Sequence, residues 1–170
     1  MDREAFKSRT LIIGNSGSGK STLAMALSRF SGCPITDLDR IHWDSDTFAT
    51  KRDEQIALQM TREAALGERW IIEGVYGWLA QAAIPRATAL IWLNLPWEEC
   101  QTGISQRGPW NKAGPNAMAA LLEWAEAYYV RQTSSSLAGH LQMFERFDGD
   151  KFAISSRQSA IAFMARLQLH

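Results

Sequence analysis

The feature that most constrains this chain is an eight-residue segment at 14–21, Gly-Asn-Ser-Gly-Ser-Gly-Lys-Ser, which matches G-x-x-x-x-G-K-[ST] in full. The apolar run at 11–13 precedes it, and a helical pattern begins near Lys20. Glycines allow positive φ and let backbone N–H groups approach an anion closely, and a helix N-terminus adds its dipole and unpaired donors. The segment therefore predicts a cradle for the phosphates of ATP or a related nucleotide.

Two side chains of this segment have chemical tasks. Lys20 is expected to reach the β- and γ-phosphates and to act in catalysis, and the Ser21 hydroxyl can ligate Mg²⁺. A chance Gly/Ser-rich turn is the alternative, but the flanking strand and helix favour nucleotide binding. The residues expected to contact the nucleotide are Gly14, Asn15, Ser16, Gly17, Ser18, Gly19, Lys20, Ser21 and Thr22.

Apolar runs alternate with helical patterns along the whole chain. The runs at 10–13, 70–72 and 89–95 are typical of strands buried on both faces of a parallel sheet, and 34–36 and 151–154 are weaker candidates. Helical stripes follow them: Leu23, Leu27, Phe30; Ile56, Met60, Ala64; Trp97, Cys100, Ile104; Leu121, Trp124, Ala125, Tyr128; Ile161, Met164, Leu167. Ser155 or Ser156 is a candidate N-cap for the last helix. This alternation predicts one doubly wound α/β domain over residues 1–170, with the loops that follow the strands along one edge of the sheet.

Three carboxylates are expected at that edge. Asp37 and Asp39 follow the second strand and would point the same way if the backbone stays extended, and Glu73 follows the buried run at 70–72. In phosphoryl transfer one carboxylate holds Mg²⁺ and another orients or deprotonates the acceptor hydroxyl. We assign Asp37 and Glu73, with Ser21, to the metal and Asp39 to the acceptor. The alternative is that these acids are N-caps or solvated loop charges.

A cation and a loop rich in turn formers follow the fourth strand. Arg107 could stabilise charge on the phosphoryl group in transfer, or it could cap a helix C-terminus. Residues 108–115 contain two prolines and two glycines and predict a short lid, with a plain surface loop as the alternative.

Several aromatic and basic residues have roles that the sequence leaves open. His42 could contact the acceptor or could merely be hydrogen-bonded. Arg157 could lie beside the nucleotide base, although a position facing solvent is slightly favoured. Trp43, Trp78 and Trp110 fall in loops, where packing is the safer expectation, whereas Trp70, Trp92 and Trp124 occupy periodic apolar positions and should be core.

Composition excludes several classes of protein. The 18 basic and 18 acidic residues balance, which speaks against nucleic-acid binding. Cys33 and Cys100 are too few for a disulfide framework and are expected to be reduced thiols. With no apolar leader or long apolar run, we expect a cytoplasmic protein that does not associate with membranes; the oligomeric state stays open.

The motifs together resemble the adenylate-kinase-like group of small P-loop kinases, and most closely the DNA topology modulation proteins, which are kinase-like in sequence. The resemblance lies in residues 11–24, 38–43, 70–76 and 90–96 and in Arg107. It implies a three-layer α/β/α P-loop NTPase fold with a five-stranded parallel sheet of order 2-3-1-4-5, helices on both faces and a short lid.

The spacing of Asp37 and Asp39 also resembles that of shikimate kinases, in which the first acid serves the metal and the second the acceptor hydroxyl. Nucleoside-monophosphate kinases place Phe-Pro-Arg after the acid-glycine pair, but residues 75–77 here are Val-Tyr-Gly. We therefore predict an ATP- and Mg²⁺-dependent kinase that phosphorylates a hydroxyl of an unidentified small molecule. The alternative is an ATP-binding regulator or NTPase with little transferase activity.

Overall fold

A five-stranded, fully parallel sheet organises the chain. The computed structural model describes residue 6 and residues 8–44, 50–108 and 115–168. The strands lie in the order β2-β3-β1-β4-β5, which confirms the predicted sheet. Their bounds are Arg9–Gly14 (β1), Ile35–Asp37 (β2), Trp70–Gly74 (β3), Ala89–Leu93 (β4) and Asp150–Ile154 (β5).

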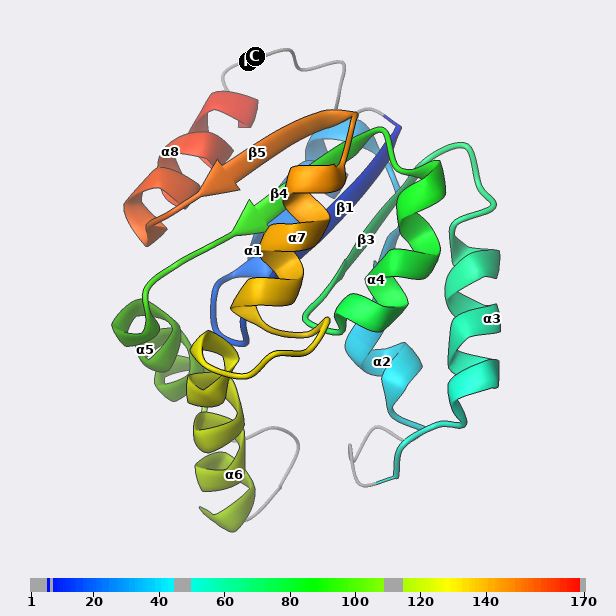
Figure 1. Ribbon diagram of the computed structural model, residues 1–170. Coiled ribbons are helices and arrows are strands. Elements are labelled where there is room, and N and C mark those ends of the chain that lie inside the picture. The colour runs from blue at the N-terminus through cyan, green and yellow to red at the C-terminus, as the bar shows by residue number, and fades with distance from the viewer. Residues whose placement is uncertain (1–5, 7, 45–49, 109–114, 169–170) are drawn as a thin grey trace.

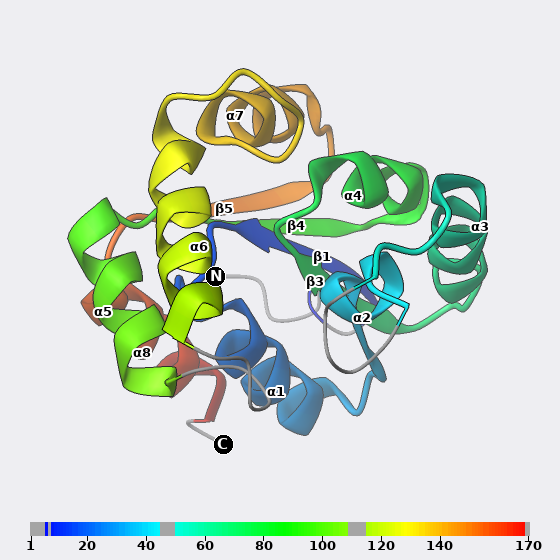
Figure 2. The same ribbon diagram turned by 90° about the horizontal axis from the view of Figure 1, so that it is seen from below.

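Helices cover both faces of the sheet (Figure 1). In Figure 2, α1 and α8 lie on one side, and α4 and α7 on the other. The α-helices span Lys20–Ser31 (α1), Leu38–His42 (α2), Glu54–Ala64 (α3), Gly77–Ala83 (α4), Trp97–Arg107 (α5), Pro115–Glu126 (α6), Leu137–Arg146 (α7) and Arg157–Gln168 (α8). Two short 3₁₀ helices span Ile84–Arg86 (η2) and Ala127–Tyr129 (η3). The arrangement is the predicted three-layer α/β/α fold.

The sheet separates two apolar clusters because neighbouring strand residues point to opposite faces. Ile12 packs with Leu27 of α1 on one face, whereas Leu11 and Ile13 pack with Leu79 of α4 on the other. Both faces of the sheet are therefore buried, which explains why the strands are continuously apolar in sequence.

Parts of the helical pattern differ from expectation. Helices α4 and α7 are not among the helices predicted from the sequence. Ile56 and Ile161, assigned to buried stripes, are 54% and 58% exposed. The last helix begins as predicted, since Ser156 Oγ accepts a 3.1 Å hydrogen bond from the Ser159 backbone N–H.

The structure describes only the two ends of the predicted lid at 108–115, because residues 109–114 lie outside the described residues. Trp110 lies among them. Within the part of the chain that the structure describes, no helix is long and apolar enough to cross a membrane.

Candidate active site

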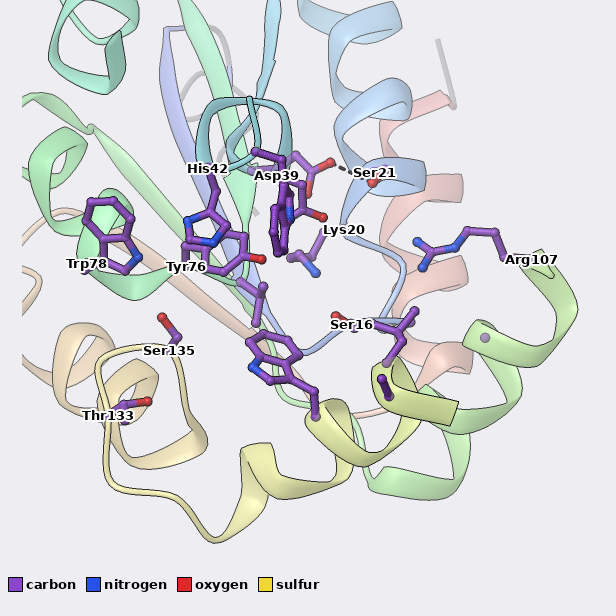
Figure 3. Close-up of a pocket in the computed structure, with 18 of the residues that line it drawn as sticks. Ser16, Lys20, Ser21, Asp39, His42, Tyr76, Trp78, Arg107, Thr133 and Ser135 are labelled. Carbon is purple, nitrogen blue, oxygen red and sulfur yellow. Dashed lines mark hydrogen bonds between the residues drawn. The ribbon is translucent and has the colours of Figure 1, made fainter. Parts of the chain in front are cut away.

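A cavity of about 1260 Å³ opens at the carboxyl ends of the strands, where the P-loop lies. Lys20, Ser21, Asp39, Glu73 and Arg107 all line it. Figure 3 shows Lys20, Asp39 and Arg107 extending into it from separate elements. Open α/β sheets place their ligand sites at this edge because the loops after parallel strands converge there.

The P-loop is held in a conformation that requires glycine. Gly19 has φ +97° and precedes the first residue of α1, and a Cβ at Gly17 would lie 2.2 Å from the Cys100 carbonyl oxygen. Lys20 Nζ donates a 2.8 Å hydrogen bond to the Asn15 carbonyl, and Asn15 Nδ2 donates one of 2.8 Å to the Ala125 carbonyl. The loop is thus preformed around its lysine.

Arg157 ties the P-loop to the C-terminal helix. One terminal guanidinium nitrogen donates to the carbonyl oxygens of Gly17, at 2.8 Å, and Glu99, at 2.9 Å. The Arg157 backbone N–H donates to Glu99 Oε2 at 2.5 Å. The slight preference for a solvent-facing Arg157 was therefore wrong, because sequence reasoning could not show that α8 begins beside the P-loop.

Ser21 and Glu73, two of the predicted metal ligands, are in contact. Ser21 Oγ donates a 2.6 Å hydrogen bond to Glu73 Oε1, and Glu73 is only 3% exposed. Burial raises the pKa of Glu73 to about 7, although Lys20 opposes the shift. Gly74 matters here because a Cβ at that position would lie 2.6 Å from Leu38 Cβ and would push α2 away from β3.

Asp37, the third predicted metal ligand, lies next to Glu73 in the sheet, since β2 and β3 pair these residues in register. Its Oδ1 accepts a 2.8 Å hydrogen bond from the Asp39 backbone N–H and so caps α2. No group of three or more His, Cys, Asp or Glu side chains among the described residues is arranged as a metal cage. The oxygen ligands fit Mg²⁺, which binds through few protein groups and completes its shell with phosphate and water.

Asp39 lies in the first turn of α2 rather than on an extended strand. The expectation that Asp37 and Asp39 point the same way assumed an extended backbone. That assumption was wrong, because Asp37 is the N-cap of α2 and the backbone is helical from Leu38 on. Burial, with a contribution from Asp37, raises the pKa of Asp39 to about 6. Its Oδ1 is buried and has no hydrogen-bond partner among the described residues.

Arg107 is the last residue of α5, which Gly108 ends with φ +74°. Its guanidinium points into the cavity (Figure 3). Burial lowers its pKa, and the negative field of Asp39, Glu73 and Asp37 acts in the opposite direction. The structure thus brings the predicted cation to the same cavity as Asp39 and Glu73, whereas Asp37 is not in the cavity lining.

Aromatic side chains form the opposite wall of the cavity. The His42 and Tyr76 rings stack with centroids 3.9 Å apart and an angle of 23° between their planes. Trp78 contacts His42 edge-on, and Trp124 lies 6.1 Å from Tyr76. Trp124 is half-buried in this wall, so its assignment to the core was wrong. Helical periodicity shows that Trp124 lies on the apolar face of its helix, but it does not show that this face borders a cavity.

A buried hydrogen-bonded chain supports this wall, and sequence reasoning missed it. Trp92 Nε1 donates to Tyr128 Oη at 3.3 Å, and Tyr128 Oη lies 2.9 Å from His140 Nδ1. His140 Nε2 lies 3.1 Å from the Val75 carbonyl, next to Tyr76. A carbonyl only accepts, so the proton is on Nε2 and Tyr128 donates to Nδ1.

Comparisons with known proteins agree with the fold. A sequence model described as isopentenyl transferase matches residues 8–85, which include the P-loop and Glu73. A search of curated protein sequences gives no significant match. The resemblance to the DNA topology modulation proteins is not shown by these comparisons.

Solved structures of small kinases superpose along nearly the whole chain. A gluconokinase from Sinorhizobium meliloti 1021 is 16% identical, with a TM-score of 0.57 over 97% of this chain and 99% of that one. A shikimate kinase from Bacteroides thetaiotaomicron is 17% identical, with a TM-score of 0.56 over 94% and 95%. A sugar kinase from Janibacter sp. HTCC2649 is 16% identical, with a TM-score of 0.54 over 92% and 90%. At such identities the similarity shows a shared fold: that of small P-loop kinases.

Proposed function

We propose that the protein is an ATP-dependent phosphotransferase that phosphorylates a hydroxyl group of a small molecule. The observation that carries the proposal is that Lys20, the Ser21–Glu73 pair, Asp39 and Arg107 line one cavity. A phosphate cradle alone would serve any nucleotide-binding protein. A buried carboxylate with an unpartnered oxygen in the same cavity adds a group that can accept a proton.

In this proposal the cradle binds the triphosphate and the carboxylate binds the acceptor. The acceptor hydroxyl oxygen forms a bond to the γ-phosphorus, and the bond from that phosphorus to the bridging oxygen of ADP breaks. Asp39 takes the hydroxyl proton, and ADP leaves. Lys20 and Arg107 stabilise the negative charge that spreads over the phosphoryl oxygens during transfer.

Mg²⁺ would be held by Ser21 Oγ together with the Glu73 and Asp37 carboxylates, directly or through water. The bound ion supplies positive charge to the phosphate oxygens and keeps the triphosphate in one geometry. Two features of these residues fit Mg²⁺. Their donor atoms are hard oxygens, and the raised pKa of Glu73 shows that this buried carboxylate has too little positive charge beside it.

The match to isopentenyl transferases favours a second candidate, prenyl transfer. There the cradle would hold the diphosphate of a prenyl donor. The acceptor atom would form a bond to C1 of the prenyl group as the bond from C1 to the diphosphate oxygen breaks, Asp39 would take the acceptor's proton, and diphosphate would leave. Dimethylallyl diphosphate, in place of ATP, would then be consumed. An ATP-binding regulator or NTPase is the third candidate, and the fold similarity to kinases does not separate it from the first.

The test is to follow the fate of the γ-phosphoryl group. The full-length protein is incubated with Mg²⁺, γ-¹⁸O-labelled ATP and a defined panel of alcohols, and products are measured by mass spectrometry. We expect a labelled phosphate monoester that is lost in Asp39→Asn and kept in Asp44→Asn, a carboxylate outside the cavity lining. Labelled inorganic phosphate alone, independent of the acceptor, would instead identify an NTPase. Consumption of dimethylallyl diphosphate, but not ATP, would identify a prenyltransferase.

A further inference from the structure

The part of the cavity beyond Asp39 is walled by rings from separate elements. His42 ends α2, Tyr76 precedes α4, Trp78 lies in α4 and Trp124 lies in α6. Figure 3 shows His42, Tyr76 and Trp78 along one side of the cavity, with Thr133 and Ser135 on the adjoining side. Segments distant in sequence thus bring flat apolar surfaces to the place where an acceptor must lie.

Contacts within the wall hold these rings in place before any ligand binds. His42 stacks on Tyr76, and Trp78 contacts His42 with centroids 5.9 Å apart at 74°. The Arg131 guanidinium lies 4.1 Å from the centre of the Trp124 ring and donates 2.8 Å hydrogen bonds to the carbonyls of Trp124 and Ser135. Preorganised rings lose little side-chain entropy when a ligand binds.

Two polar atoms beside the rings lack a hydrogen-bond partner among the described residues. They are Asp39 Oδ1 and His42 Nδ1, and both are buried. Leaving such atoms without a partner costs stability, which a ligand O–H or N–H would recover. A saturated polyol needs many such partners, yet two nearby polar side chains of the lining are already engaged: Ser135 Oγ accepts from the Gly77 backbone N–H at 3.0 Å, and Arg131 donates to the carbonyls of Trp124 and Ser135.

Building on the phosphotransferase proposed above, we infer that the acceptor is an alcohol that carries a flat, unsaturated ring. The ring lies against Tyr76 and Trp124, and the hydroxyl lies at Asp39. Aromatic side chains favour such a ring through offset-stacked and edge-to-face contacts, which a puckered ring of the same size makes less well. The wall therefore selects by ring planarity, and Asp39 selects for the hydroxyl.

Two probes test planarity directly. Benzyl alcohol and cyclohexylmethanol share a CH₂OH group on a six-membered ring and differ in whether the ring is flat. Their affinities for the full-length protein with Mg²⁺ and ADP are measured by ligand-observed NMR, with D-gluconate as the polyol. We expect benzyl alcohol to bind about tenfold more tightly than cyclohexylmethanol. Equal affinities of the two alcohols, no binding of either, or tighter binding of gluconate would overturn the inference.

Two variants locate the ring. Tyr76→Leu and Trp124→Leu should each weaken benzyl alcohol binding about tenfold and leave ATP affinity unchanged, because neither ring belongs to the phosphate cradle. Trp97→Leu is the control, since Trp97 packs against the core on the face of α1 and is not in the lining. Unaltered benzyl alcohol binding in both wall variants would overturn the assignment, and the probe pair still tests the wild type should a variant fail to fold.

The same experiment separates this inference from the function on which it rests. Binding of benzyl alcohol that depends on Tyr76, without a phosphate monoester from any alcohol in the panel, would support the ring site and refute phosphotransfer. Phosphorylation of gluconate with no preference between the two ring alcohols would support phosphotransfer and overturn the ring inference.

Discussion

Ser21 Oγ donates a 2.6 Å hydrogen bond to Glu73 Oε1, although the two residues are 52 positions apart in the chain. The serine lies in the first turn of α1 and the glutamate in β3, which pairs with β1 so that Glu73 is opposite Ile12. The phosphate cradle and the buried carboxylate are therefore positioned by neighbouring strands of one sheet. The predictions below follow from this arrangement and from the groups around it.

Replacing Lys20 by Ala should weaken nucleotide binding or misplace the β- and γ-phosphates without unfolding the protein. Lys20 supplies the positive charge within the cradle, and its loss should cost roughly 2–4 kcal/mol in transfer. Isothermal titration with ATP and Mg²⁺ and a turnover assay measure the effect, with circular dichroism as the check on folding. Lys151→Ala is a matched control, because Lys151 Nζ binds the carbonyls of Phe144 and Phe147 outside the cavity lining. Unchanged affinity and turnover in Lys20→Ala would show that the phosphates bind elsewhere.

Replacing Asp39 by Asn should slow phosphoryl transfer by about 10²-fold or more while ATP affinity stays nearly constant. The amide keeps the size of the side chain but cannot take a proton from the acceptor. Single-turnover kinetics with labelled ATP separate the transfer step from binding. Asp44→Asn, an exposed acid paired with Arg52, should behave as wild type. A variant that loses ATP affinity yet transfers normally once ATP is bound would contradict the assignment.

Arg107→Ala should lower turnover more than it lowers ATP affinity. The Arg107 charge faces the carboxylates around Asp39, where negative charge spreads as the phosphoryl group moves, so its contribution should be greatest in the transition state. Comparison of kcat with the dissociation constant for ATP measures the difference. Arg29→Ala, an exposed arginine in the last turn of α1, serves as the control. A loss of ATP affinity with unchanged kcat would mean that Arg107 stabilises the ground state and the transition state equally.

Arg157→Ala should destabilise the fold and weaken nucleotide binding together. The variant loses the guanidinium hydrogen bonds to Gly17 and Glu99 but keeps the backbone bond to Glu99 Oε2. Hydrogen bonds from a charged donor contribute about 1.5–3 kcal/mol each, so the free energy of unfolding should fall by at least about 1.5 kcal/mol. Urea unfolding and ATP titration measure both effects, with Arg146→Ala at the exposed end of α7 as the control. Wild-type values for both would show that the P-loop does not need this anchor.

His140 should make a contribution to the stability of the protein that rises with pH between about 3 and 6.5, whereas Asp39 and Glu73, whose pKa values are raised in the folded protein, contribute in the opposite direction. Burial lowers the pKa of His140 from the usual 6.5 of histidine to about 3. Within this window the unfolded chain binds a proton at this site and the folded protein does not, so the contribution is lost as pH falls and complete above 6.5. The maximum slope for one site is about 1.4 kcal/mol per pH unit.

Urea unfolding at pH 4.5 to 7.5 tests this expectation. His140→Gln should be less stable than the wild type at pH 7, because it disturbs the hydrogen bonds to Tyr128 and Val75, and this difference in stability should shrink as pH falls below about 6.5. His42→Gln is a second test with the same expected direction, because burial in the cavity wall lowers the pKa of His42 to about 4. An unchanged slope in His140→Gln would mean that this histidine is protonated alike in both states.

The fold and the phosphate cradle could be predicted because their signals lie close together in sequence. Adjacent glycines, Lys20 and Ser21 build the cradle from one loop, and continuous apolar runs define the buried strands. The acids at 37, 39 and 73 could be placed at one edge because parallel strands bring their carboxyl ends together. The backbone turn between Asp37 and Asp39 could not be predicted, because it depends on the Asp37 side chain, which caps α2.

Helices α4 and α7 were missed for local reasons. Helix α4 has only seven residues, and α7 places His140 where an apolar residue would mark the stripe. Both pack against the sheet, and this packing stabilises them, since isolated helices of this length are marginal in water.

The sequence by itself determined the P-loop, the strand order that its resemblance to small P-loop kinases implies, and the edge of the sheet at which the candidate site lies. Tertiary structure alone decided that Trp124 faces a cavity, that Arg157 holds the P-loop, and that His42 stacks on Tyr76. The physical reason is that periodicity reports whether a side chain is apolar on one face of its helix. What that face meets depends on how distant segments pack.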